Sequence, residues 1–205
     1  MQGSNRDAII IIQINGIYES EKQHMVILED YGENVWKPKL TDSEIDALTR
    51  YTQNESKVIN LVLNSNTGRI ADELKDDIDK ISSAINKFKL QDDITVYRGI
   101  SKEEYEQIVI GNQPFKTFLS FKSTSIDEKQ ADIFSSLSNM ESSCNNIDKH
   151  ILVVNVPRGS RAAYIASVSD SPKEKEFLLD KDTNYHIVDV VEYENIKYIF
   201  IEVLR

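Results

Sequence analysis

Cysteine and histidine are scarce in this sequence, and their scarcity excludes several kinds of site. The only cysteine is Cys144, so no disulfide can form within the chain. The three histidines, His24, His150 and His186, are scattered and show no zinc-ligand spacing with each other or with the cysteine. We therefore expect no metal site.

Long apolar stretches are also missing. No window approaches the length of a transmembrane helix. The short apolar run of residues 8–12 is β-branched and is followed by a polar residue and a turn pair, so it favours a strand over a signal peptide. The expected location is the cytoplasm of the cell that makes the protein, or of a cell into which the protein is delivered.

Positive charge is in deficit, with 24 basic against 34 acidic residues and a formal net charge of −10. This balance disfavours nonspecific binding to nucleic acids or to anionic membranes. A local basic groove is still compatible with it, so a nucleic-acid partner is not favoured but is not excluded.

What is present is the composition of a soluble globular protein, with 40% hydrophobic and 28% charged residues. A chain of 205 residues suits one domain with an extension. Residues 1–40 are predicted to form an N-terminal β extension of unknown role, and residues 41–205 the main domain. In the extension, strands are expected at Ala8–Ile14 and His24–Leu28, with Asn15-Gly16 as a hairpin turn after the first.

Helices are predicted in the first half of the main domain. Thr41 and Glu44 stand at capping-box spacing, which indicates a helix start at Thr41. A short apolar helix is expected over residues 56–64. The clearest helix lies within residues 69–90, where apolar residues recur every three or four positions in one stripe: Leu74, Ile78, Ile81, Ile85 and Phe88.

Strands dominate the second half, apart from a short helix capped by Ser101 and Glu104. Helices first and strands later, without βαβ alternation, predict an α+β fold with a largely antiparallel sheet system. The expected strands cover residues 94–99, 117–125, 150–157, 161–165, 173–179, 185–193 and 196–203.

Three short motifs stand at the ends of these strands, and each has an ordinary structural explanation. The arginine of Tyr97-Arg98-Gly99 suits a salt bridge at a strand end, and Ser123-Thr124-Ser125 suits a turn or a helix cap. On a strand, the carboxylates of Glu174-Lys175-Glu176 share a face and repel each other, as on a solvated edge. Their joint order and placement carry more information than each motif alone.

In this order the motifs resemble the mono-ADP-ribosyltransferase family, in the branch with an Arg, Ser-Thr-Ser, Glu-x-Glu signature. The branch includes binary actin-modifying toxins, arginine-specific vertebrate ectoenzymes and enzymes of T-even-like phages. The segments YTQNESKVIN and FKSTSIDEKQADIF also resemble the family, and the likeness spans roughly Thr41 to Arg205. It implies a fold in which N-terminal helices pack on two antiparallel-rich β-sheets that form an NAD cleft.

The resemblance also implies a reaction, in which NAD is cleaved at its nicotinamide–ribose bond and ADP-ribose passes to an arginine of a target protein. It assigns Glu176 to stabilising the positively charged ribose, Glu174 to the acceptor and Ser123 to orienting Glu176. Arg98 suits the NAD phosphates, and Gly99 lets the nicotinamide approach the backbone. The implied NAD-binding residues are Arg98, Gly99, Asn60, Thr124 and Ser125, the last two expected to be more structural than chemical.

Several alternatives stay open. The acceptor could instead be a different side chain, a nucleic-acid base or water, and a noncatalytic binding module could keep the same fold. The loop Ala166–Lys173 lacks an aromatic residue where many toxins dock their target, and Leu63-Asn64 stands where many relatives have Leu-Arg. The sequence does not determine the target protein, the oligomeric state or the setting, which could be a phage, an intracellular effector or part of a larger toxin.

Overall fold

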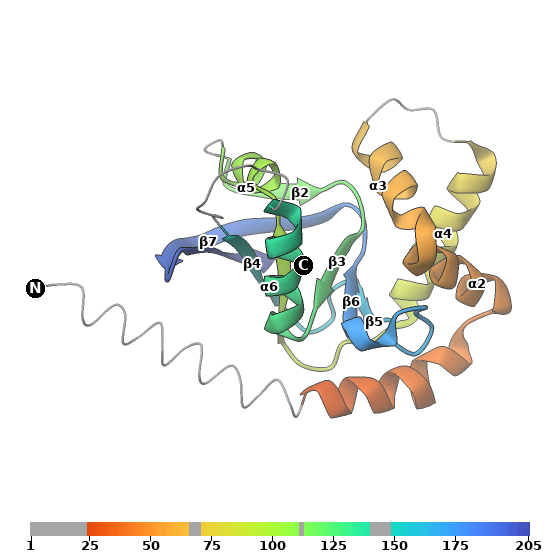
Figure 1. The fold of residues 1–205 in the computed structure, drawn as a ribbon. Coiled ribbons are helices and arrows are strands. Elements are labelled where there is room, and N and C mark those ends of the chain that lie inside the picture. The colour runs from red at the N-terminus through yellow and green to blue at the C-terminus, as the bar shows by residue number, and fades with distance from the viewer. Residues whose placement is uncertain (1–23, 66–70, 111–112, 140–148) are drawn as a thin grey trace, which may run out of the picture.

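The computed structural model describes residues 24–65, 71–110, 113–139 and 149–205, with helices first and a β-sheet second (Figure 1). Among these residues, no helix is long and apolar enough to cross a membrane. Two of the helical turns, Gly32–Trp36 and Tyr51–Glu55, are π-helical, and Lys37–Lys39 is a 3-10 turn. The helical part comprises a first helix over residues 24–31, η1 (Gly32–Trp36), η2 (Lys37–Lys39), α2 (Asp42–Arg50), η3 (Tyr51–Glu55), α3 (Ser56–Ser65) and α4 (Asp72–Lys87).

The first helix shows that the strand prediction at His24–Leu28 is wrong. An unbroken apolar run fits either a strand or a buried helix, because it has no period. Here Leu28 and Trp36 are both buried at a spacing that suits one helix face. The indole N–H of Trp36 donates to the carbonyl of Ala84 in α4 at 2.9 Å, so this segment packs on the helices that follow. The strand and turn expected at residues 8–16 lie outside the described residues.

The cap and stripe predictions for the helices that follow are confirmed. Thr41 Oγ1 accepts the Glu44 N–H, and the Glu44 carboxylate accepts the Thr41 N–H at 2.7 Å, which completes the capping box. Ser101 caps α5 (Lys102–Val109) by accepting the Glu104 N–H at 3.2 Å. The apolar stripe faces the core, with Leu74 partly buried and the other members fully buried: Ile78, Ile81, Ile85 and Phe88.

The described part of the second half forms one sheet with the order β2-β7-β8-β4-β1-β3-β6-β5. All of its pairs are antiparallel except β4 with β8, so the α+β class with a largely antiparallel sheet is confirmed. The single strand expected at 117–125 is divided, because β2 pairs with β7 and β3 with β6 toward opposite edges of the sheet. The strands are β1 (Ile94–Ile100), β2 (Lys116–Phe118), β3 (Lys122–Ser125), β4 (Lys149–Val156), β5 (Ala162–Tyr164), β6 (Glu176–Leu179), β7 (Thr183–Tyr193) and β8 (Ile196–Val203).

The two sheets that were expected are two halves of this one sheet. β1 pairs with β4 over seven residues and β3 pairs with β6 over four, but β1 and β3 pair only at Tyr97 and Ser125. A continued antiparallel ladder would place Gly99 opposite Ser123, and the pairing stops before that point. The sheet therefore opens beside this junction.

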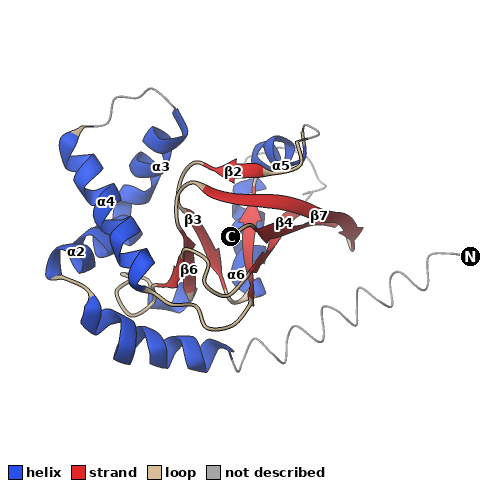
Figure 2. Cartoon of the chain, turned by 180° about the vertical axis from the view of Figure 1, so that it is seen from behind, coloured by secondary structure: helices blue, strands red, loops and turns tan. Residues whose placement is uncertain are grey.

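Helices cover both faces of the sheet near the junction. Val96 belongs to the large core that includes α2 and α4, whereas its neighbour Tyr97 packs in a smaller cluster with Ala131 of α6 (Glu128–Asn139). Figures 1 and 2 show α6 lying across β1 and β4, with α2, α3 and α4 grouped beyond β6. At Gly99 the two backbones leave no room for a side chain, because a Cβ there would lie 2.1 Å from the Ala131 carbonyl oxygen. Packing of α6 on β1 therefore requires glycine at this position.

Candidate active site

The strand register brings the three motifs together around one cavity. Ser125 pairs with Tyr97 of β1 on one side and with Glu176 of β6 on the other. A cavity of about 150 Å³ lies beside this junction. Seven of the eight predicted site residues line this cavity: Arg98, Gly99, Ser123, Thr124, Ser125, Glu174 and Glu176. The eighth, Asn60, lines a larger cavity of about 770 Å³.

Glu176 is the first residue of β6 and is only 6% exposed. Burial raises the pKa of its carboxyl to about 7, and the charge of Glu174 raises it as well. A hydrogen bond with the Ser123 side chain and the charge of Arg98 lower this pKa, but they do not outweigh the burial. A positive charge that enters the cavity would stabilise the ionised form of this carboxyl group.

Glu174 does not lie on a strand, contrary to the prediction. It ends a 3-10 turn, η4 (Pro172–Glu174), and Lys175 follows in the left-handed region with φ 50°. Strand pairing begins only at Glu176. The two carboxylates therefore reach the same cavity from a turn and from a strand, and the argument that they share a strand face does not hold.

The end of β3 fastens this turn to the sheet. Ser125 Oγ donates to the carbonyl oxygen of Glu174 at 2.8 Å. The Thr124 hydroxyl donates to the carbonyl of Phe177 in β6. Both side chains thus have structural bonds of the kind that was expected, and their contact with NAD stays a prediction.

Arg98 has a backbone partner and an acidic partner. Its Nη1 donates to the Ser123 carbonyl at 2.9 Å, and its Nη2 lies 3.3 Å from Oε2 of Glu104. Glu104 also pairs with Lys122, at 2.9 Å. Burial raises the pKa of Glu104, but the charges of Arg98 and Lys122 outweigh it and hold this pKa at about 2. The salt bridge considered for Arg98 is therefore present, and the same side chain lines both cavities.

Asn60 links the helical part of the protein to the site. Its Nδ2 donates to the hydroxyl oxygen of Tyr51 at 3.1 Å. Tyr51 is buried and packs edge-to-face on Phe121, with ring centroids 5.7 Å apart. Burial raises the pKa of Tyr51, and the charge of Glu176 raises it further. Tyr51 therefore lies within electrostatic reach of the buried carboxylate.

The loop before Glu174 is tied to the helical part by three hydrogen bonds. Thr49 Oγ1 donates to the Val168 carbonyl at 3.0 Å. The Asp170 N–H donates to Thr52 Oγ1 at 3.0 Å, and Gln53 Nε2 donates to the Asp170 carboxylate at 3.1 Å. Two of these anchors, Thr52 and Gln53, belong to the π-helical turn η3. The loop that leads to Glu174 thus has a defined position.

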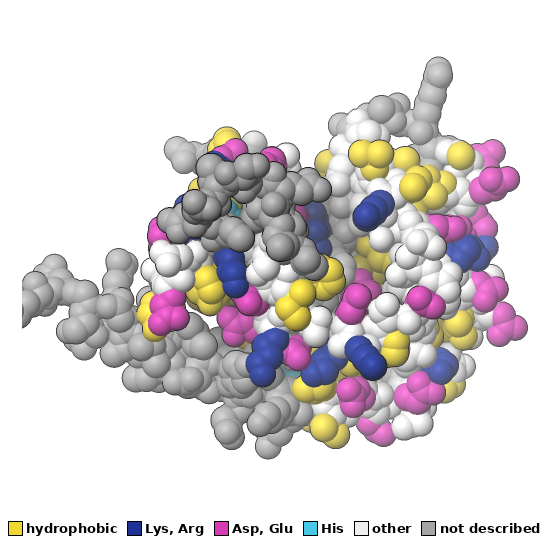
Figure 3. All heavy atoms as spheres, in the orientation of Figure 1, with side chains coloured by type: hydrophobic (Ala, Val, Ile, Leu, Met, Phe, Trp, Pro, Cys, Tyr) yellow, Lys and Arg dark blue, Asp and Glu magenta, His cyan; other side chains and the backbone are white. Residues whose placement is uncertain are grey.

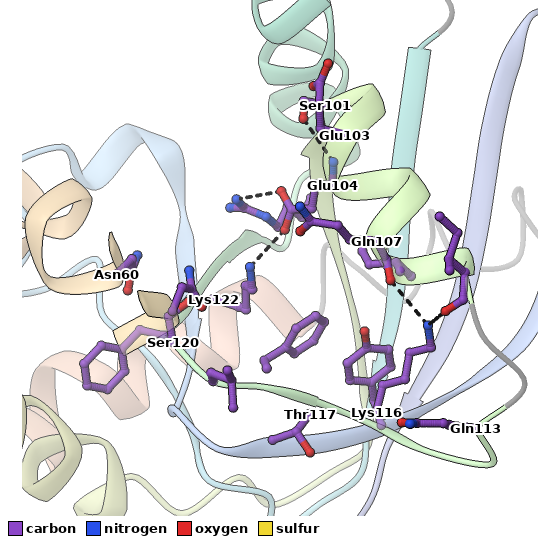
Figure 4. Close-up of a pocket in the computed structure, with 18 residues that line it drawn as sticks. Asn60, Ser101, Glu103, Glu104, Gln107, Gln113, Lys116, Thr117, Ser120 and Lys122 are labelled. Carbon is purple, nitrogen blue, oxygen red and sulfur yellow. Dashed lines mark hydrogen bonds and ion pairs between the residues drawn. The ribbon is translucent and has the colours of Figure 1, made fainter. Parts of the chain in front are cut away.

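Sequence reasoning missed several of these residues. Glu104 was identified only as a cap partner, although its side chain joins two cations in the larger cavity (Figure 4). Lys122 stands directly before the Ser-Thr-Ser motif, and this position was the only local signal for it. Thr52 and Gln53 belong to the segment YTQNESKVIN that resembles the family, but their contacts with the loop carried no signal, because their partners lie more than a hundred residues away.

Comparison with protein families identifies relatives of the chain. Residues 29–205 match the ADP-ribosyltransferase exoenzyme family. NAD(+)–arginine ADP-ribosyltransferase EFV of Enterococcus faecalis is 34% identical over 159 residues, which are 77% of this chain and 31% of that protein. The chain thus spans about a third of the length of this curated relative.

Solved structures show the same fold. Plx2a, an ADP-ribosyltransferase toxin from Paenibacillus larvae, matches with a TM-score of 0.70 at 24% identity, covering 91% of this chain and 96% of that one. The ADP-ribosyltransferase Vis of Vibrio splendidus, in complex with agmatine, matches with a TM-score of 0.66 at 20% identity, covering 91% of this chain and 86% of that one. The expected ADP-ribosyltransferase fold is confirmed.

Proposed function

The chain belongs to the ADP-ribosyltransferase exoenzyme family, and we propose that it cleaves the nicotinamide–ribose bond of NAD and transfers ADP-ribose to an arginine of a target protein. The observation that carries this proposal is Glu176, a buried carboxyl group with a pKa of about 7 in a cavity shared with Glu174, Ser123 and Arg98. The proposed catalytic domain comprises residues 41–205, and the helical segment before it packs on α4 through Trp36.

On the donor side, Glu176 stabilises the charge that develops on the ribose. When the nicotinamide–ribose bond breaks, the nicotinamide nitrogen keeps the bonding electrons and leaves as a neutral group, and positive charge develops on the sugar. A carboxylate next to the sugar favours this step, and the attraction is stronger in a buried site than in water. Entry of the positively charged nicotinamide ring also lowers the pKa of Glu176, so the group is ionised when the bond breaks.

On the acceptor side, Glu174 receives the guanidinium of an arginine. It is less buried than Glu176 and ends the turn η4. A carboxylate at this position attracts the cationic acceptor and takes a proton from it as the new bond to the ribose forms. Arginine appears in the name of the Enterococcus faecalis relative, and the agmatine bound to Vis carries the same guanidinium group.

Water is the natural competitor of the acceptor, so slow NAD hydrolysis should accompany transfer. A noncatalytic module is disfavoured because Arg98 and Glu176 are both in place at one cavity. We further propose that the protein acts in the cytoplasm, either of the producing cell or of a target cell that receives it as a toxin.

The experiment uses NAD labelled in its adenylate half, incubated with the protein and with no acceptor, with agmatine, or with a cell lysate. Wild type should release nicotinamide and label agmatine. Glu176→Gln should lower both activities by at least about a hundredfold, because it removes the charge opposite the ribose. Glu174→Gln should lose agmatine labelling but keep hydrolysis. Glu33→Gln, at an exposed glutamate of η1, is the matched control and should behave as wild type.

Two results would count against the proposal in different ways. Nicotinamide release without labelled agmatine would refute the arginine acceptor and leave the NAD chemistry standing, and labelled lysate components would then reveal the acceptor. No nicotinamide release under any condition would refute the enzymatic function and favour a binding module.

A further inference from the structure

The larger cavity, of about 770 Å³, adjoins the Glu176 cavity at Arg98 and has an unusual balance of charge. One carboxylate, Glu104, is shared by two cations inside it (Figure 4). Lys122 Nζ lies 2.9 Å from Glu104 Oε1, and Arg98 Nη2 lies 3.3 Å from Glu104 Oε2. This cluster of three side chains therefore carries one excess positive charge.

The two remaining charged residues that line this cavity do not change the balance. They are Glu103, which is exposed, and Lys116, whose Nζ donates to the carbonyls of Gln107 and Ile110 at the end of α5. Their charges are opposite and cancel. The excess is notable in a protein with a net charge of −10, whose acidic side chains gather along the outer side of the helical part in Figure 3.

Lys122 is too well buried to be an ordinary surface lysine. Its side chain is 15% exposed, against 28% for Arg98 and 23% for Glu104. Burial lowers the pKa of Lys122; the Glu104 carboxylate raises it, and Arg98 lowers it again. A salt bridge that served only the fold would need one cation for one carboxylate. A second desolvated cation lowers the stability of the folded protein unless another anion binds beside it and balances its charge.

We infer that Lys122, together with Arg98, binds the diphosphate of NAD. The inference rests on the proposed function. Because Arg98 lines both cavities, an anion bound to it lies between them. NAD has its diphosphate between two nucleosides, so a nicotinamide riboside at Glu176 leaves the diphosphate at Arg98 and the adenosine in the larger cavity. The diphosphate has two anionic phosphates, so the guanidinium and the ammonium can each contact one of them, and lysine is an effective phosphate ligand as a point charge.

Glu104 explains how these cations are kept ready for the substrate. It holds the ammonium and the guanidinium on its two carboxylate oxygens, so neither side chain has to be ordered when the ligand arrives. In Lys122→Met, Glu104 keeps Arg98 as its partner, and the variant should fold. Lys122→Gln is a second variant in case methionine is not tolerated at this position.

The test measures the binding of ADP and of adenosine by calorimetry, separately from turnover. In Lys122→Met, the Kd for ADP should rise about tenfold, and the Kd for adenosine should change less than about twofold, because only ADP has the diphosphate. The KM for NAD should rise by a similar factor, with an unchanged kcat for hydrolysis. Lys122→Arg should keep most of the ADP affinity. Lys80→Met, at a lysine of α4 that pairs with Asp76 and lines neither cavity, is the matched control and should leave both Kd values unchanged.

The ratio of ADP to adenosine affinity decides the outcome. An equal loss of both affinities in Lys122→Met would mean that Lys122 only shapes the cavity, and an unchanged ADP affinity in a folded variant would overturn the inference outright. Absence of NAD turnover in the wild type would instead be a failure of the proposed function, which these binding measurements do not depend on.

Discussion

Glu176 should destabilise the folded protein at neutral and alkaline pH, because its carboxyl group is buried away from water. Its pKa in the folded state is about 7, against an ordinary value of 4.5. The folded state therefore holds this proton more tightly than the unfolded state, and ionisation above pH 4.5 lowers the free energy of unfolding. At 1.36 kcal/mol per pKa unit, the loss reaches about 3 kcal/mol at pH 8, and only about 1 kcal/mol of it is present at pH 5.

Replacing the carboxyl with an amide removes this titration and keeps the shape of the side chain. Glu176→Gln should therefore be more stable than wild type, by roughly 2 kcal/mol more at pH 8 than at pH 5. For a chain of this length, that difference corresponds to roughly 4–8 °C in Tm. Thermal melting of both proteins at the two pH values, with nucleotide absent, measures it directly.

Glu44→Gln is the matched control, because Glu44 is also buried but its pKa moves in the opposite direction. Burial raises this pKa, but hydrogen bonds with Lys87, Thr41 and Ser83 outweigh it and hold the pKa at about 2. Because the pKa of Glu44 is lowered on folding, its ionised carboxylate stabilises the folded state above pH 4.5, and this stabilisation is lost only as the pH falls toward 2. Glu44→Gln should therefore be destabilised almost equally at pH 5 and pH 8. If Glu176→Gln showed the same flat difference, or were less stable than wild type at pH 8, burial would not be the dominant influence on Glu176.

Two further predictions concern the same region. The kcat/KM for NAD hydrolysis should rise with pH through an acid limb near pH 7, because Glu176 must be ionised. Glu174→Gln should move this limb to lower pH, because it removes a charge that raises the pKa of Glu176. An unmoved limb would show that the charge of Glu174 does not influence the pKa of Glu176. Gly99→Ala should lower the free energy of unfolding by about 3 kcal/mol or more, because its Cβ would lie 2.1 Å from the Ala131 carbonyl oxygen. Gly32→Ala is the control and should be tolerated, because the nearest atom to its Cβ lies at 3.6 Å. Equal melting temperatures of the two variants would show that α6 can shift to accommodate the added methyl group.

The parts of the fold that could be predicted were those specified by neighbouring residues. The capping box at Thr41 and the apolar stripe of α4 are local patterns, and both appear in the structure as expected. The strand prediction at His24–Leu28 was wrong because a continuous apolar run has no period, and only its packing partners decide between helix and strand. Trp36 is such a partner, and its bond to Ala84 spans 48 residues.

The site divides in the same way. The three motifs were recognisable because each is contiguous, and the register of β1, β3 and β6 explains why they meet. The conformation at Glu174 was mispredicted because Pro172, directly after the serine-rich loop, begins a 3-10 turn, and the left-handed Lys175 ends this turn just before the strand begins. The Glu104–Lys122 pair was missed because it joins α5 to β3, and no sequence pattern links residues on different elements.

The site depends on a sheet that is interrupted between β1 and β3. A continued ladder would have joined Gly99 to Ser123 and closed the space that the cavity occupies. Instead the ladder stops at Tyr97 and Ser125, and the Arg98 guanidinium donates to the Ser123 carbonyl. The interruption also places a permanent cation between the two cavities, where it faces a carboxylate on each side. The fold therefore lacks strand pairing at the position where the proposed binding of a dinucleotide requires both an opening in the sheet and a positive charge at its centre.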